Sequence, residues 1–190
     1  MRISAAIGMV LAFVAMSVVA GDLEDGEKFL KSKEYAKAII SFRKAAEQGN
    51  ADAQVKLGSL YAEGRGVARD YKQAVLWFQK AAAQGNVNAH ISLGSMYEEG
   101  QGVAKDYKQA AYWYEKAAAQ RNVIAQFMLY SLYSEGVAKD NLEAHKWLSI
   151  AAANGMAALR PMREMLEKEM TREQIAEAQR RASEWIKAHQ

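Results

Sequence analysis

A block of 36 residues occurs twice in succession in this chain, and a shorter third copy follows. Residues 51–86 read ADAQVKLGSLYAEGRGVARDYKQAVLWFQKAAAQGN, and residues 87–122 read VNAHISLGSMYEEGQGVAKDYKQAAYWYEKAAAQRN; 22 of the 36 positions are identical without a gap. Residues 123–156 repeat the block with two residues missing after Gly136. Repeats of this length predict a stack of small units, each of which buries its apolar face against its neighbours.

Each block predicts two helices joined by a glycine turn. Asn50 and Asn86 are suitable N-caps for a first helix of about thirteen residues, which ends at a glycine-x-glycine sequence that begins at Gly64 in the first block. Asp70 opens the second helix and is followed three residues later by Gln73, as in a capping box with an acidic cap. The predicted core stripe of this second helix consists of Ala74, Trp77, Phe78, Ala81 and Ala82.

The first twenty residues are not expected to belong to the fold. Arg2 gives a positive start, residues 3–19 are apolar or small, and Ala20 precedes Gly21 at the expected cleavage site, which is the order of a secretory signal peptide. The alternative is an uncleaved N-terminal membrane anchor, since about 17–18 apolar residues can just span a bilayer. We therefore expect a periplasmic or secreted protein, with no membrane insertion after cleavage of the signal peptide.

The composition narrows the classes of partner. Removal of residues 1–20 takes away one arginine and lowers the formal net charge from +3 to +2, which is poor evidence for nucleic-acid binding. The chain has no cysteine, so disulfides and thiolate metal ligands are excluded. A single proline and the many Ala, Leu, Lys, Glu and Gln residues favour helix throughout.

The repeats resemble Sel-1-like repeats, close relatives of the tetratricopeptide repeat. The matching residues are Leu57-Gly58, Tyr61, Gly64-x-Gly66-Val67, Asp70-Tyr71, Ala74, Trp77-Phe78 and Ala81-Ala82. The resemblance implies an all-α fold, a right-handed α/α superhelix of helix–turn–helix repeats. It divides the chain into a signal peptide (1–20), a tetratricopeptide-like half repeat (21–50), three repeats (51–86, 87–122 and 123–156, the last with a shortened loop) and a C-terminal helical cap (157–190). In the third repeat Tyr130 replaces the glycine, and we expect a tighter, locally altered turn there.

Residues that would carry catalysis or bind a metal form no convincing pattern. Ser41 and Lys44 fit the S-x-x-K sequence of penicillin-recognising enzymes, but the other sequences of that class are missing and Ser41 falls inside a predicted second helix. His90, His145 and His189 are scattered at no ligand spacing, and we expect them at exposed helix positions. We predict no enzyme activity, no cofactor and no metal.

One apolar column on the first helices is not explained by the core. Val55 lies about 160° from the core stripe centred near Leu57, at 100° per residue, and Ile91 and Phe127 take the same place in the next copies. In tetratricopeptide-like stacks this side lines the concave groove, so we predict a partner-binding stripe. The predicted binding residues are Val55, Ile91, Phe127, Asp52, Asn88, Ser59, Ser95, Glu98 and Glu99, with Ser131 beside them.

The column and its rim allow more than one interpretation. Val55 and Ile91 could instead be buried between neighbouring first helices, and Phe127 could be buried under the C-terminal cap. Glu98 and Glu99 could be a catalytic carboxylate pair or solvated helix ends. We predict an exported scaffold, a monomer rather than an obligate oligomer, that holds a protein partner of unknown identity. The alternatives are a structural subunit of an envelope assembly and an enzyme that acts on cell-wall or β-lactam substrates.

Overall fold

The computed structural model describes residues 21–136 and 140–189. Residues 1–20, which contain the predicted signal peptide, lie outside the described residues, as do residues 137–139 and 190. The chain divides into two compact units, one up to Ala89 and one from His90 onward. The boundary falls within α5 (Val87–Glu99).

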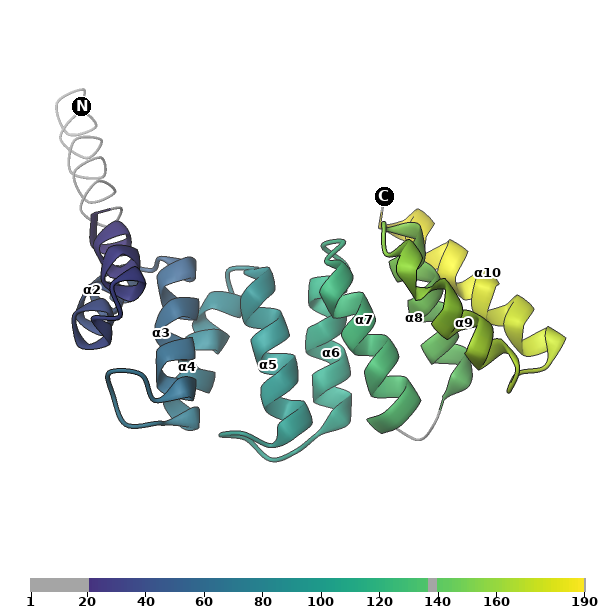
Figure 1. The fold of residues 1–190 in the computed structure, drawn as a ribbon, viewed down its shortest axis with the longest axis horizontal. Coiled ribbons are helices and arrows are strands. Elements are labelled where there is room, and N and C mark those ends of the chain that lie inside the picture. The colour runs from purple at the N-terminus through teal and green to yellow at the C-terminus, as the bar shows by residue number, and fades with distance from the viewer. Residues whose placement is uncertain (1–20, 137–139, 190) are drawn as a thin grey trace, which may run out of the picture. The chain divides into compact units, whose positions relative to one another are not determined.

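The first unit consists of antiparallel helices joined by short turns. It contains helical residues 21–31 and the helices α2 (Tyr35–Glu47), α3 (Ala51–Glu63) and α4 (Tyr71–Ala82) (Figure 1). Helix α3 packs against both α2 and α4, and its buried Leu57 lies in the same interior as Phe42 and Phe78. A Cβ added at Gly58 would lie 2.7 Å from the Phe78 ring, so that this close packing requires glycine.

The second unit continues the pattern and ends in a helical cap. It contains most of α5, then α6 (Tyr107–Ala118), α7 (Val123–Ser131), a π-helical turn (Leu132–Gly136), α8 (Asn141–Ala153), a 3-10 turn (Ala157–Leu159), α9 (Arg160–Glu167) and α10 (Arg172–Ala188). Helix α7 packs against α6 and α8, and both α9 and α10 pack against α8 (Figure 1).

The predicted helix ends are confirmed by their hydrogen bonds. The Asn50 side chain accepts a hydrogen bond from the Ala53 amide at 2.8 Å, and Asp70 accepts one from the Gln73 amide at 3.0 Å. Gly64 ends α3 in the left-handed conformation, with φ of 68°, which a residue with a Cβ adopts at a cost. These local signals therefore fix where the helices of each repeat begin and end.

The core of the second helices differs from the predicted stripe at one position. Trp77 and the equivalent Trp113 are only half-buried, whereas Trp147 of α8 is 1% exposed. Trp77 lies one residue, or about 100°, from Phe78 at the centre of the buried face, while Val75 on the other side is buried. The Lys80 ammonium covers the open side of the Trp77 indole, 4.1 Å from the ring centroid.

Two histidines predicted at exposed positions are buried. His90 is 5% exposed, and His145 is fully buried. The His145 Nε2 atom lies 2.9 Å from a Glu167 carboxylate oxygen, so the imidazole links α8 to α9. The prediction for His145 was wrong because the cap covers this face of α8, and the repeat pattern contains no information about the cap. His90 instead stacks on the Trp113 ring, with the centroids 5.7 Å apart.

The third repeat is locally altered, but its described part contains a wider helical turn instead of the predicted tighter one, together with a side-chain exchange. Helix α7 ends in a π-helical turn, which is wider than an α-turn and not tighter; residues 137–139 of the shortened loop lie outside the described residues. Tyr130 stands where Gly94 stands in the second repeat, and Leu148 stands where Tyr114 stands. Tyr130 packs against the buried cluster of Leu148, Ala151 and Leu159, so the large aromatic ring has moved from the second helix to the first.

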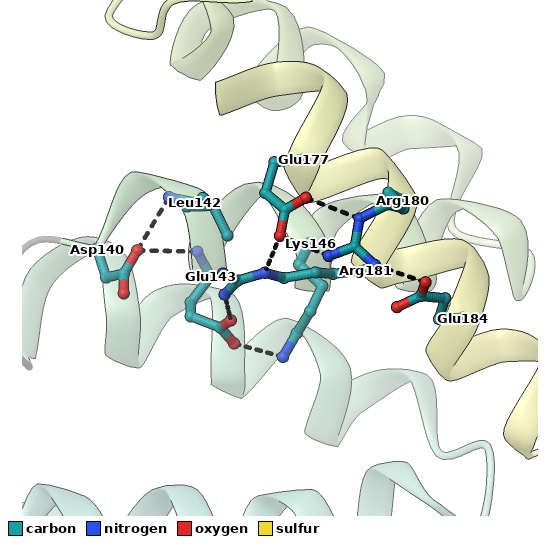
Figure 2. Close-up of polar contacts among 8 residues, drawn as sticks. All are labelled: Asp140, Leu142, Glu143, Lys146, Glu177, Arg180, Arg181 and Glu184. Carbon is teal, nitrogen blue, oxygen red and sulfur yellow. Dashed lines mark hydrogen bonds and ion pairs between the residues drawn. The ribbon is translucent and has the colours of Figure 1, made fainter. Parts of the chain in front are cut away.

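The C-terminal helix is attached to α8 by charged groups as well as by packing. The Arg181 guanidinium donates to Glu143 of α8 at 3.0 Å and to Glu177 of its own helix at 2.8 Å (Figure 2). Glu143 is also paired with Lys146. The Trp147 and Trp185 rings meet edge to face beside this network, with their centroids 5.4 Å apart. Residues 171–189 therefore cover the outer side of α8.

Candidate functional site

A groove of about 780 Å³ opens between α5 and α7 in the second unit. The loop after α5 and the start of α6 also contribute to its lining. The lining residues are Ile91, Ser95, Glu98 and Glu99 of α5, Gln101 and Lys105 of the loop, Tyr107 and Tyr114 of α6, and Met128, Ser131 and Glu135 of α7 and its π-helical turn. Apolar side chains from two helices thus alternate with carboxylates and hydroxyls.

The base of the groove contains a tyrosine and a glutamate in direct contact. The Tyr114 ring is 1% exposed and lies against the bare backbone of Gly94, where an added Cβ would be 2.4 Å from the ring. Its hydroxyl donates a hydrogen bond to the Glu98 carboxylate at 2.7 Å. Burial, followed by the adjacent Glu98 carboxylate, raises the pKa of Tyr114 above its usual value, so the phenol stays protonated and remains a donor. Glu98 is therefore held in place by a rigid neutral partner.

The second carboxylate of the groove is also held by neutral groups. The Ser95 hydroxyl donates to Glu99 at 3.0 Å, and the Gln101 side-chain amide donates to the other oxygen of the same carboxylate. The Lys105 ammonium lies over the Tyr107 ring, 4.7 Å from its centroid. The lining thus carries three glutamates and one lysine, and it is negative although the whole chain is positive.

The same positions in the first unit are neutralised. Glu63, which corresponds to Glu99, pairs with Arg65 at 2.7 Å, and Gln101 replaces this arginine in the second repeat. Ala62 stands where Glu98 stands. The added Glu98 and the loss of the neutralising arginine are therefore properties of the second repeat and not of the repeat pattern.

The structure brings four of the predicted binding residues to this groove. Ile91, Ser95, Glu98 and Glu99 all line it, and so does the neighbouring Ser131. Ile91 is half-buried and faces the groove. Glu98 is half-buried and hydrogen-bonded. It is therefore not a solvated helix end, which was one of the two interpretations of this residue.

The remaining predicted residues lie elsewhere. Val55 is half-buried in the first unit, and its carbonyl accepts a hydrogen bond from the Ser59 hydroxyl at 3.0 Å. Asp52 is exposed and accepts a hydrogen bond from the Asn86 amide at 2.9 Å, and Asn88 is exposed near the start of α5. None of these four predicted residues is among the groove-lining residues of the described second unit.

Phe127 packs under the C-terminal cap, which was the second of the two positions considered for it. Its ring is half-buried and lies 5.7 Å from that of Tyr130, measured between centroids. It packs against the cluster formed with Leu148 and Leu159, where Met162 of the cap also lies. Phe127 therefore contributes to the attachment of the cap.

Sequence reasoning did not assign the other groove-lining residues to the binding stripe. Tyr114 occupies the place of Phe78 in the predicted core stripe, and its ring is indeed buried. The change from phenylalanine to tyrosine, together with the change from Ala62 to Glu98, was the available signal. The other lining residues are brought to the groove by the course of the loop after α5 and by the packing of the helices. They are Gln101, Lys105, Tyr107, Met128 and Glu135.

Comparison with known proteins identifies the repeat. The family model described as Sel1 repeat matches residues 16–50, 51–86, 87–122 and 123–156. The chain belongs to the Sel1 repeat family. Members of this family generally act as protein-interaction scaffolds, and the fold is of a non-catalytic, scaffold type. No curated protein matches this Sel1 repeat chain.

Two solved structures are similar to this Sel1 repeat protein. A protective antigen present in uropathogenic Escherichia coli strains, which displays an SLR fold, is 31% identical with a TM-score of 0.57; the match covers 90% of this chain and 46% of that one. A Sel1 repeat protein from Oxalobacter formigenes is 35% identical with a TM-score of 0.63, and the match covers 72% of this chain and 57% of that one. The chain thus spans about half the length of these relatives.

Three further features of the Sel1 repeat structure concern a metal site, a membrane span and the candidate catalytic serine. Within residues 21–136 and 140–189, no three His, Asp or Glu side chains come together as metal ligands would. None of the helices in these ranges is both long and apolar enough to cross a membrane. Ser41, the candidate nucleophile, lies in the middle of α2 and is buried, whereas Lys44 is exposed one turn later.

Proposed function

We propose that this Sel1 repeat protein is an exported scaffold without enzyme activity and that it holds a segment of a partner protein in the groove between α5 and α7. The proposal is carried by the composition of that groove. Ile91 and Met128 offer apolar contact from two different helices, and Ser95, Ser131 and the glutamates surround them with hydrogen-bonding groups. An apolar centre with a polar rim is the usual anatomy of a protein interface.

The size and rigidity of the groove support binding of an extended segment or a helix. A volume of about 780 Å³ exceeds that of one side chain and suits several consecutive residues. The Tyr114 ring is fixed against Gly94, and Glu98 and Glu99 already have hydrogen-bond donors. Because these groups are ordered before binding, little conformational entropy is lost when a partner binds.

The experiment is a selection of random short peptides displayed on phage against the purified protein. A groove-blocked variant, Ser131→Trp, fills the groove with a large neutral side chain. Its matched control is Ser183→Trp, which places the same side chain at an exposed position of α10 outside the groove. Peptides selected on the wild type should bind the control variant equally well and should lose at least about tenfold in affinity for the blocked variant.

The comparison of the two variants decides the proposal. Circular dichroism and the melting temperature should be alike for both tryptophan variants, because neither position is in the core. If the selected peptides bind Ser131→Trp as tightly as the wild type, the groove is not the binding surface and the proposal is wrong.

A further inference from the structure

We infer that the groove selects partner segments that present a lysine or arginine side chain next to an aliphatic one, with Glu98 as the anchor for the cation. This inference rests on the proposed function and specifies the chemistry of the partner. It is carried by the charge of the groove, by the hydrogen bonds that hold its carboxylates, and by the comparison of the second repeat with the first.

The charge of the groove is opposite to that of the chain. Glu98, Glu99 and Glu135 line it with Lys105, while the whole protein has a formal net charge of +3. The Lys105 ammonium lies over the Tyr107 ring at 4.7 Å from the centroid. The hydrogen bonds to Glu98 and Glu99 come from Tyr114, Ser95 and Gln101, which are all neutral, so they orient the carboxylates without cancelling their charge.

Two coupled substitutions between the repeats add charge that packing does not need. Phe78 fills the space beside Gly58 in the first repeat without any hydroxyl group. The second repeat replaces this phenylalanine with Tyr114 and places Glu98 within reach of its hydroxyl. A buried ring fills the core equally well in both repeats, so the core does not require the added hydroxyl and carboxylate. These two groups change the chemistry of the groove surface instead.

A third substitution removes a cation from the same place. In the first unit the Arg65 guanidinium lies 2.7 Å from the Glu63 carboxylate and neutralises it. In the second repeat Gln101 stands at the arginine position and donates to Glu99 as a neutral amide. The carboxylate is thus oriented but left with its charge, which is the arrangement that a bound ammonium or guanidinium group would complete.

The occupant is a peptide and not a free cation because of the apolar lining. Ile91, Met128 and the Tyr107 ring lie in the same groove as the carboxylates. A lysine or arginine followed or preceded by Leu, Ile, Val or Met would place its charge at Glu98 and its neighbour against these side chains. A partner segment with acidic residues at this place would be repelled.

The first test is the composition of the peptides that the phage selection returns. Peptides that bind the wild type and lose affinity for Ser131→Trp should be enriched in Lys or Arg adjacent to an aliphatic residue. Groove-dependent peptides without this enrichment would leave the proposed function standing and overturn the inference. A selection without any groove-dependent peptide would overturn both.

The second test uses the most enriched peptide, labelled with fluorescein, in an anisotropy titration. Glu98→Gln should weaken its binding about tenfold, and Gln101→Arg, which copies the first repeat, should weaken it about fivefold. The matched controls Glu47→Gln and Gln79→Arg make the same charge changes at exposed positions of α2 and α4 and should change the affinity less than twofold. The difference in affinity between the wild type and the groove variants should become smaller at high salt, because salt also weakens binding of the peptide to the wild type.

Three outcomes of the titration would contradict the inference. If Gln101→Arg binds the peptide as tightly as the wild type, the charge at Glu99 is not used. If Glu98→Gln also binds normally, or if free arginine alone displaces the peptide completely at millimolar concentration, the groove does not select the combined cationic and aliphatic segment.

Discussion

The contact between Gly94 and Tyr114 predicts an unusual effect of a glycine-to-alanine substitution. In an unobstructed helix this change stabilises the protein by about 1 kcal/mol, because alanine loses less backbone entropy than glycine. Here the new Cβ would lie 2.4 and 2.5 Å from two ring atoms of Tyr114, whereas carbon atoms in contact lie about 3.5–4.0 Å apart. The ring would have to move by about 1 Å in a packed core, and its hydrogen bond to Glu98 would be lost.

These opposing contributions give a net loss of stability. Overpacking of this kind costs about 1–3 kcal/mol, and the lost hydrogen bond costs about 1 kcal/mol. After the helix-propensity gain is included, Gly94→Ala should lower the free energy of unfolding by about 1–3 kcal/mol. Denaturant unfolding monitored by circular dichroism measures this difference directly.

The third repeat supplies the companion variant. There Tyr130 and Leu148 replace the glycine and the tyrosine, so a leucine at position 114 should leave room for a side chain at position 94. Tyr114→Leu alone should cost about 2–3 kcal/mol through the smaller side chain and the lost hydrogen bond. In that background Gly94→Ala should stabilise the protein, which reverses the sign of its effect. A stabilising effect of Gly94→Ala in the wild-type background would refute the reasoning.

Three further predictions concern the two ends of the chain. If the signal peptide is cleaved as expected, intact-mass spectrometry of the exported protein should show a chain that begins at Gly21; an intact N-terminus in the membrane fraction would favour the anchor instead. Truncation after Gly155 removes α9 and α10 from α8 and should cause aggregation or loss of cooperative unfolding, while a soluble and equally stable fragment would contradict the role of the cap. Hydrogen bonds from Arg180 and Arg181 lower the pKa of Glu177 from 4.5 to about 2, so these ion pairs within α10, which hold Arg181 beside Glu143 of α8, are present above about pH 4.5 and are lost as the pH falls towards 2. Tryptophan fluorescence should report that loss, and Glu177→Gln, which removes the titrating group, should abolish this step.

The sequence by itself determined the helices and their order. Periodicity, the caps at Asn50 and Asp70 and the left-handed glycine at Gly64 are local signals, because each involves residues only a few positions apart. The repeat then required the helices to stack, and the identity between the blocks placed Ile91, Ser95, Glu98 and Glu99 on one side of a first helix. These four groove-lining residues, with Ser131 beside them, could therefore be named before the structure.

Only the tertiary structure decided which side chains meet across the helices. The contact between Tyr114 and Glu98 joins residues sixteen positions apart on two helices, and no helical period relates them. His145 is buried because the cap covers α8, and Trp77 is half-buried because the buried face centres on its neighbour Phe78. These outcomes depend on the angle and distance between packed helices, which the side chains of all elements set together. The pattern within one helix predicts its apolar face, but its neighbours determine which part of that face remains open to a partner.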